Sequence, residues 1–283
     1  MYGSLLSALL LGLLPLVSTA QQSNAIAQIA VAPPAHPLVL ADSLSASGIL
    51  VIDVASGQPV YAKQATVRRP MASITKLMTA LLIVENHDLN EVVTVSHNAT
   101  QVIGNRAYLP AEEKFTVGDM LTALLVASAN DAAIVLAEHH SGSVDAFVQE
   151  MNTRAQQLGL QDTSYADPIG LDHADQFSTP RDIAWLTSFV LKKPEIAQRM
   201  EKRWARIYSA EGTEVSLAHT HALIQQNTTA VVAGKTGTTT DARQCLVSMV
   251  EQNGRQYIVV LLYSGSRYAD MLTILRAMGA TLV

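Results

Sequence analysis

Residues 47–63 read Ser-Gly-Ile-Leu-Val-Ile-Asp-Val-Ala-Ser-Gly-Gln-Pro-Val-Tyr-Ala-Lys and contain the first strong strand signals of the chain. Two apolar runs flank the turn residues Ala55-Ser-Gly-Gln, a pattern that predicts two strands joined by a tight turn. The same signals return near the other end, where apolar runs over 246–250 and 257–263 flank Gln252-Asn-Gly. We therefore expect one sheet whose strands come from both ends of the chain.

The middle of the chain shows apolar residues at helical spacing instead. The predicted helices cover residues 71–85, 116–127, 131–140, 143–158, 179–193 and 268–278. The fifth begins with Thr179-Pro-Arg-Asp, which supplies a cap, a proline at the first helical position and an acid in the first turn. This order predicts an α/β (α+β) domain over residues 45–283, with an all-helical subdomain at roughly 86–200 inserted between sheet segments.

The first 44 residues have a different character. No Asp, Glu, Lys or Arg precedes Asp42, and a nearly unbroken apolar run ends in Ser18-Thr-Ala20. This pattern predicts a secretory signal peptide over residues 1–20, cleaved after Ala20, and hence an exported protein. An uncleaved membrane anchor is the alternative, but the run is shorter than the ~20 residues needed to span a bilayer, so we expect no integral membrane protein. Residues 21–44, rich in Ala, Gln and Pro, are predicted to form a flexible stem.

The composition excludes several classes of protein. With 49% hydrophobic and 15% charged residues, the chain does not fit the composition of disordered proteins. A net charge of −5 argues against a nucleic-acid partner. The single cysteine, Cys245, excludes an internal disulfide. Neither His139-His140 nor His219-Thr-His221 has the i, i+4 spacing of a zinc-binding helix, so we expect no metal site and no cofactor.

Ser73-Ile-Thr-Lys76 opens the most apolar predicted helix. The spacing places the hydroxyl and the amine on one helix face, separated by about 4.5 Å along the axis. A serine needs a neighbouring base to become a good nucleophile, and a lysine can be that base if burial or a second cation lowers its pKa. The alternative is a helix cap followed by a solvated lysine.

Ser128-Ala-Asn130 lies where one apolar helix ends and the next begins. A polar pair at such a junction is expected to face a cleft, although Asn130 or Asp131 could simply cap the second helix. The same spacing occurs in Ser96-His-Asn98, within a polar stretch. We favour Ser128 because of its position between two apolar helices.

Lys235-Thr236-Gly237-Thr238 follows a short β-like segment over residues 229–233. A lysine beside two hydroxyls suits a receptor for a carboxylate. Gly237 would let a substrate backbone approach the strand closely. The alternative is that the glycine and the threonines merely end a strand.

Together and in this order, the three motifs resemble the Ser-x-x-Lys, Ser-x-Asn and Lys-Thr-Gly set of penicillin-binding proteins and serine β-lactamases. Ser73-Ile-Thr-Lys-Leu-Met-Thr-Ala and Ser128-Ala-Asn-Asp-Ala-Ala, with Gln157-Leu-Gly-Leu-Gln-Asp-Thr downstream, resemble the low-molecular-mass D-alanyl-D-alanine carboxypeptidases and endopeptidases. The resemblance extends from about Ser45 to Gly279. It implies the DD-peptidase/β-lactamase-like transpeptidase fold, an antiparallel sheet flanked by helices with a helical subdomain.

The resemblance also implies roles for the motif residues. Ser73 would attack the carbonyl of a D-alanine residue, with Lys76 as the general base. Ser128 would relay a proton to the leaving amine, and Asn130 would hold Lys76 and a substrate amide.

The third motif would bind the substrate. Lys235 would attract the substrate carboxylate and, as a second cation, lower the pKa of Lys76. The hydroxyls of Thr236 and Thr238 would hold that carboxylate. The backbone N–H groups of Ser73 and Thr238 would form the oxyanion hole.

Two departures help to choose within the family. Class A β-lactamases read Ser-Asp-Asn and carry a deacylating glutamate; here Ala129 replaces the aspartate, and no Glu occurs between Glu150 and Glu195. Rapid penicillin hydrolysis is therefore not expected. Few residues follow Thr238. In this respect the chain resembles the short, anchorless branch of the family that is associated with D,D-endopeptidase activity.

Three functions are compatible with the sequence. The first is a periplasmic D,D-peptidase of cell-wall metabolism, acting on peptidoglycan peptides through an acyl-serine intermediate and inhibited by β-lactam antibiotics that acylate it. The second is a serine β-lactamase. The third is a non-catalytic sensor that binds penicillin or muropeptides.

Overall fold

The computed structural model describes residues 38, 40, 44–226 and 229–279. The predicted signal peptide over residues 1–20 and most of the predicted stem over 21–44 lie outside the described residues. Among the helices that the structure describes, none combines the length and the apolar character needed to span a membrane.

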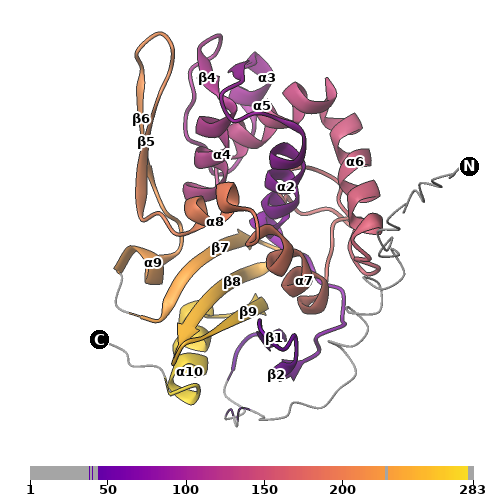
Figure 1. Ribbon diagram of the computed structural model, residues 1–283. Helices are drawn as coiled ribbons and strands as arrows, with labels where there is room; N and C mark the ends of the chain where they lie inside the picture. The colour runs from indigo at the N-terminus through magenta and orange to yellow at the C-terminus, as the bar shows by residue number, and fades with distance from the viewer. Residues whose placement is uncertain (1–37, 39, 41–43, 227–228, 280–283) are drawn as a thin grey trace, which may run out of the picture.

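A five-stranded antiparallel sheet forms the base of the domain (Figure 1). Its strands, in spatial order, are β2 (Pro59–Lys63), β1 (Gly48–Asp53), β9 (Arg255–Ser264), β8 (Arg243–Gln252) and β7 (Val231–Thr239). The first and last strands of the sequence meet in its centre, where Leu50 of β1 lies opposite Val260 of β9. The prediction of a sheet built from both ends of the chain is confirmed.

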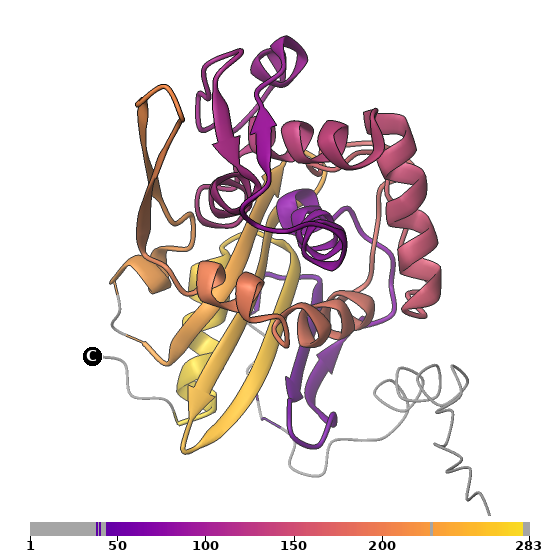
Figure 2. The ribbon, with the colours of Figure 1, turned by 45° about the horizontal axis from the view of Figure 1, so that its top comes forward.

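The two faces of the sheet carry separate apolar cores, because alternate residues of a strand point to opposite faces. On one face, Val51 of β1 and Leu261 of β9 pack against Met271 of α10 (Arg267–Ala277). Leu50 and Val260 belong to the larger core on the opposite face, together with residues of α2, α7 and α8. Figure 2 shows α7 and α8 crossing that face, with α10 on the other side of the sheet.

Five helices of the larger core follow the predicted ranges, whereas the two short helices over residues 97–101 and 194–200 were not predicted. The helices of this core are, in chain order, α2 (Lys76–Asn86), α3 (His97–Gln101), α4 (Val117–Val126), α5 (Asn130–Ser141), α6 (Val144–Gln157), α7 (Pro180–Val190) and α8 (Pro194–Met200). A 3-10 turn, η1 (Ala72–Thr75), precedes α2. The segment expected to be all-helical also contains a two-stranded sheet of β3 (Val92–Thr94) and β4 (Lys114–Thr116).

The beginning of α7 is as predicted, whereas α8 is a new element. The side chain of Thr179 accepts a hydrogen bond from the backbone N–H of Asp182, and Pro180 occupies the first helical position. α7 ends at Val190, before Pro194 as predicted, and Pro194 itself begins the additional helix α8. A proline suits the first turn of a helix as well as the end of the preceding one.

The sheet region contains two further differences. The strand expected at residues 229–233 is β7, which begins at Val231 and continues to Thr239, so the Lys235 motif lies within the strand rather than after it. The structure also contains elements that the sequence does not predict: a hairpin of β5 (Trp204–Tyr208) and β6 (Glu214–Ala218), and the helix α9 (Ala222–Gln226).

Candidate active site

Ser73 and Lys76 lie side by side at the junction of η1 and α2. Lys76 is fully buried, whereas Ser73 is half-buried. The Nζ atom of Lys76 lies 2.9 Å from Ser73 Oγ, and it donates to Asn130 Oδ1 at 2.7 Å and to the carbonyl of Ile169 at 2.6 Å. The geometry therefore joins the first motif to the second motif and to the loop before α7.

The Asn130 side chain is held in one orientation. Its Nδ2 donates to the carbonyl of Ile103 at 2.7 Å, so its Oδ1 faces Lys76. Asn130 begins α5, at the helix junction predicted from the sequence.

The electrostatics of Lys76 suit a base. Burial lowers its pKa from 10.5 to about 7, although the carboxylates of Asp167 and Asp131 act in the opposite direction. A neutral amine has two N–H bonds and one lone pair. Because the Asn130 and Ile169 oxygens accept the two N–H bonds, the lone pair is left for the hydroxyl of Ser73.

Ser128 has an unusual backbone, with a φ of +58°. The Asn105 side chain donates to the carbonyls of Ala127 and Ser128, and the Asn105 carbonyl accepts the backbone N–H of Asn130. A non-glycine residue in this left-handed region carries strain that its surroundings must hold in place. These contacts direct the Ser128 hydroxyl toward β7.

Lys235 reaches this hydroxyl from the sheet. Its buried Nζ donates to Ser128 Oγ at 2.6 Å and to the carbonyl of Thr236 at 3.0 Å. Burial, followed by the nearby charges of Lys76 and Arg267, lowers the pKa of Lys235 well below its ordinary value. For Lys76, burial alone lowers the pKa, so the expectation that Lys235 lowers it as a second cation is not supported.

The two threonines of the third motif differ in exposure. Thr236 is buried, and its hydroxyl donates to the hydroxyl of Thr220 at 2.6 Å. Thr238 is exposed. Both lie on β7 beside Lys235 and so line the same edge of the site.

Gly237 is required by packing within the protein itself. A Cβ at this position would lie 2.9 Å from Ala72 Cβ, 2.9 Å from the backbone N of Ser73 and 3.0 Å from the carbonyl of Met71. We expected Gly237 to let a substrate backbone approach β7 closely. In the structure the glycine also lets the protein's own η1 pack against β7.

From the sequence, the irregular loop over residues 165–178, which contains Asp167, could either border the cleft or be a plain connector; in the structure it completes the site. The Asp167 carboxylate accepts the backbone N–H groups of Ile169, Gly170 and Leu171 and one N–H of Gln176. This network fixes the carbonyl of Ile169 that faces Lys76. A Cβ at Gly170 would lie 2.1 Å from the carbonyl oxygen of Ala72, so this loop also packs directly on η1.

The competing motif takes no part in this arrangement. Ser96 caps α3 by accepting the backbone N–H of Ala99, and its hydroxyl donates to Glu138. The structure therefore joins Ser73, Lys76 and Asn130 by hydrogen bonds and, beside them, Ser128 and Lys235, whose amine lies close enough to Lys76 for the two charges to interact. Thr236, Gly237 and Thr238 follow Lys235 on β7.

Comparison with known proteins agrees with this geometry. Residues 33–265 match the family model Peptidase_S11, described as D-alanyl-D-alanine carboxypeptidase. The chain is 33% identical over 223 residues to the D-alanyl-D-alanine carboxypeptidase DacF of Bacillus subtilis, a match that covers 76% of this chain and 57% of DacF. It is 32% identical over 251 residues to a D-alanyl-D-alanine endopeptidase of Pseudomonas aeruginosa, covering 87% of this chain and 80% of that protein.

Solved structures share the fold. A D-alanyl-D-alanine carboxypeptidase from Mycobacterium tuberculosis superposes with a TM-score of 0.80 and 28% identity, over 88% of this chain and 96% of that one. The Streptomyces K15 DD-transpeptidase superposes with a TM-score of 0.78 and 27% identity, over 84% and 98%. The resemblance inferred from the three motifs and the predicted fold class are thereby confirmed. The chain belongs to the Peptidase_S11 family of D-alanyl-D-alanine carboxypeptidases.

Proposed function

We propose that the chain is a serine D,D-peptidase that cleaves D-alanine-containing bonds of peptidoglycan through an acyl-serine intermediate. One observation carries the proposal: two pure acceptors, Asn130 Oδ1 and the Ile169 carbonyl, take up both N–H bonds of a neutral Lys76. The remaining lone pair faces Ser73 Oγ at 2.9 Å, which is hydrogen-bonding distance for proton transfer.

The reaction follows from these contacts. The Ser73 hydroxyl gives its proton to Lys76 Nζ as its Oγ forms a bond to the D-alanine carbonyl carbon. The C–N bond of the amide then breaks, and the leaving nitrogen takes a proton from the Ser128 hydroxyl, which Lys235 in turn replenishes across their 2.6 Å contact. The proton held by Lys76 then restores the Lys235–Ser128 pair to its starting protonation, so Lys76 is neutral again. Water gives a proton to Lys76 as its oxygen bonds to the ester carbon, and Lys76 passes this proton to Ser73 Oγ as the C–Oγ bond breaks, which releases the acid and restores free Ser73.

Negative charge on the substrate carbonyl oxygen needs two donors. We assign them to the backbone N–H groups of Ser73 and Thr238. Gly237 supports this assignment, because it lets β7 approach so closely that a Cβ there would lie 2.9 Å from Ser73 N. Donors placed in advance at a developing oxyanion are usually among the largest contributions to catalysis.

The substrate carboxylate fits the third motif. The Lys235 amine and the Thr238 hydroxyl lie on this strand as a cation and a donor, and the Thr236 hydroxyl adds a second donor when it exchanges its hydrogen bond to Thr220 for one to the substrate. Burial disfavours the charged form of Lys235. The negative charge of an approaching carboxylate counters this effect and stabilises the ammonium form. This interaction selects peptides with a carboxylate beside the scissile amide.

Two substrates meet this requirement. A terminal D-Ala-D-Ala and a cross-link at the D-centre of diaminopimelate both present a carboxylate at that position, so carboxypeptidase and endopeptidase activity differ only on the other side of the bond. Relatives named D-alanyl-D-alanine endopeptidase occur in Pseudomonas aeruginosa and in Escherichia coli. We therefore include cleavage of cross-links in the proposal, and place the protein in the periplasm on the signal-peptide pattern of residues 1–20.

β-Lactams would act as inhibitors by acylating Ser73. In place of the aspartate of Ser-Asp-Asn the chain has Ala129, and between Glu150 and Glu195 the sequence holds no glutamate to activate a deacylating water. The acyl-enzyme is therefore expected to persist.

Purified protein should be incubated with labelled penicillin and, separately, with purified cross-linked muropeptide dimers and with pentapeptide monomers. Long-lived labelling together with cleavage of either muropeptide supports a D,D-peptidase, and the preferred muropeptide decides between endopeptidase and carboxypeptidase. Rapid loss of label would indicate a β-lactamase instead. Stable labelling without any cleavage would indicate a non-catalytic sensor.

A further inference from the structure

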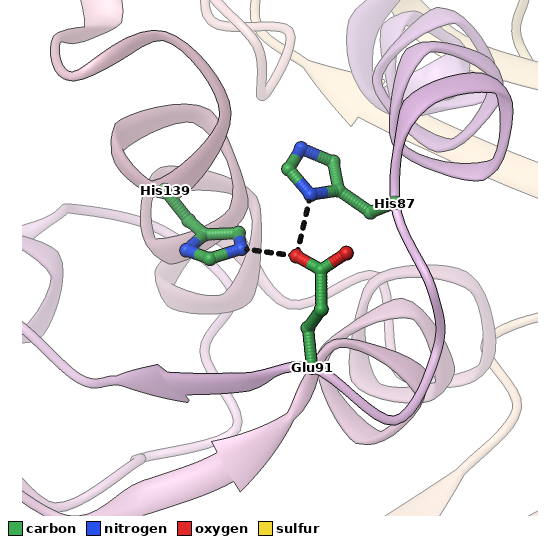
Figure 3. Close-up of side chains that lie close together, drawn as sticks. All are labelled: His87, Glu91 and His139. Atoms are coloured by element: carbon green, nitrogen blue, oxygen red, sulfur yellow. Dashed lines mark hydrogen bonds and ion pairs between the residues drawn. The ribbon is translucent and has the colours of Figure 1, made fainter.

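Three histidines and two glutamates form a connected cluster far along the helices from the candidate active site. His87 ends α2, Glu91 follows in the next loop, and His139 and His140 lie in the last turn of α5. Glu150 comes from α6. Figure 3 shows His87 and His139 pointing toward the Glu91 carboxylate from two different elements.

The inner three side chains converge on one carboxylate oxygen. His87 Nδ1 lies 2.8 Å and His139 Nε2 lies 3.1 Å from Glu91 Oε2, and the three atoms all lie within 4.8 Å of one another. The other oxygen, Oε1, accepts the backbone N–H of Asp88 at 2.8 Å, which fixes the carboxylate. Ligand atoms of a tetrahedral zinc ion, at bonds near 2.0–2.1 Å, stand about 3.3 Å apart, so small side-chain rotations suffice to admit an ion.

The outer residues form a chain of hydrogen bonds behind His87. His87 Nε2 lies 2.8 Å from His140 Nδ1, and His140 Nε2 lies 2.9 Å from Glu150 Oε2. Metal-bound histidines almost always direct their second ring nitrogen to such a partner, which sets the tautomer and the ring orientation. The His140 side chain is 8% exposed, so the residue that supports His87 is buried. The Glu91 side chain is 40% exposed, so its carboxylate faces solvent.

Two neutral rings cannot close the hydrogen-bond network behind Glu91, which needs either a third hydrogen, carried by one protonated ring, or a metal cation in its place. The chain Glu91–His87–His140–Glu150 has three contacts, and each contact needs one hydrogen. Two neutral imidazoles carry only two N–H bonds. If a metal ion takes the place of the hydrogen on His87 Nδ1, the two remaining N–H bonds satisfy the two remaining contacts, and both rings stay neutral.

The position in the fold also suits a cation. The cluster joins the C-terminal ends of α2 and α5, where the helix dipoles are negative. The same two helices begin at Lys76 and Asn130, which meet in the candidate active site. An ion at the far ends would thus tie together the two helices that position these residues.

We propose that a divalent transition-metal ion binds to His87 Nδ1, Glu91 Oε2 and His139 Nε2. The ion is assigned as Zn²⁺, because two imidazoles and a carboxylate are a ligand set that Zn²⁺ prefers. Three protein ligands leave a fourth position for water. His140 and Glu150 are the supporting residues behind His87. The spacing rule that led us to expect no metal site could not detect this one, because its ligands come from two helix ends and a loop.

The test uses the full protein without a polyhistidine tag, stripped of metal by a chelator. Calorimetric titration with Zn²⁺ should show one ion per chain, and Zn²⁺ should raise the Tm. Co²⁺ should produce the intense visible absorption of a tetrahedral site. Absence of stoichiometric binding, or an octahedral Co²⁺ spectrum, overturns the proposal.

Variants locate the ion. Glu91→Gln and His139→Ala, both at partly exposed side chains, should abolish the Co²⁺ absorption, and Glu150→Gln should weaken Zn²⁺ binding by about 10–100-fold. His97→Ala is the matched control, because His97 forms an exposed pair with Glu112 at 3.6 Å outside the cluster. Circular dichroism of each metal-free variant checks its folding. Binding that survives both Glu91→Gln and His139→Ala, or falls equally in His97→Ala, contradicts the assignment.

Discussion

The amine of Lys235 lies 2.6 Å from the hydroxyl of Ser128, although the two residues are 107 positions apart in the sequence. This contact links the sheet to the junction of α4 and α5, and it distinguishes Ser128 from the competing Ser96. It also requires both residues to be placed by long-range packing, because neither lies on the element that carries Ser73.

Ser128→Ala should slow acylation by penicillin by about 100-fold or more, the usual scale for loss of a proton-transfer group. The rate of labelling by a fluorescent penicillin measures this change. Ser96→Ala is the control, because Ser96 shares the motif spacing but caps α3. An equal loss in the two variants would show that Ser128 has no special role.

Acylation should depend on the protonation of Lys76, whose pKa is lowered to about 7. Below that value the amine carries a proton and has no lone pair for Ser73, so the rate should fall about tenfold for each pH unit. Above it the rate should level off. A profile that is flat between about pH 5 and 8 would contradict the role of Lys76 as the base.

Asp167→Asn should shift this profile to lower pH. The Asp167 carboxylate raises the pKa of Lys76, so removal of its charge lets burial lower that pKa further. The variant keeps an oxygen for part of the backbone network but weakens it, so a lower rate at the plateau is expected as well. Asp175→Asn, at an exposed carboxylate of the same loop, should leave the profile unchanged. A shift to higher pH would contradict the electrostatic argument.

Gly237→Ala should reduce both stability and activity. The new methyl group would meet Ala72 Cβ and Ser73 N at 2.9 Å, and overpacking of this kind destabilises by about 1–3 kcal/mol. Relief of the contact would move Ser73 away from β7, so the acylation rate should fall more than the lost stability alone explains. In Gly265→Ala the nearest atom of Ser45 lies at 3.5 Å, so thermal unfolding and labelling of this control should stay close to those of the unchanged protein.

Much of the fold could be predicted because local signals agreed with the final packing. The strand–turn–strand pattern near Ala55 and the Thr179-Pro180 helix start each survive unchanged. The missed β5–β6 hairpin had a sequence signal only in its second strand, where Glu214-Val-Ser-Leu alternates polar and apolar residues; in the first strand the exposed positions include Trp204 and Tyr208, which hide the alternation. Short strands of this kind are easily overlooked beside long helices.

The candidate site was only partly predictable. Motif spacing identified Ser73 and Lys76 because they share one helix face. The Ile169 carbonyl and the Asp167 network could not be found in this way, because a backbone oxygen carries no sequence signal and the loop reaches Lys76 only through tertiary packing. The same limit explains the His87 cluster, whose members meet only after α2 and α5 have packed.

The most direct test of the central claim is mass spectrometry of the protein after reaction with penicillin. The account predicts a gain of one penicillin per chain, carried by the proteolytic peptide that contains Ser73, and no gain in Ser73→Ala. Modification of a peptide without Ser73, or undiminished modification of Ser73→Ala, would contradict it.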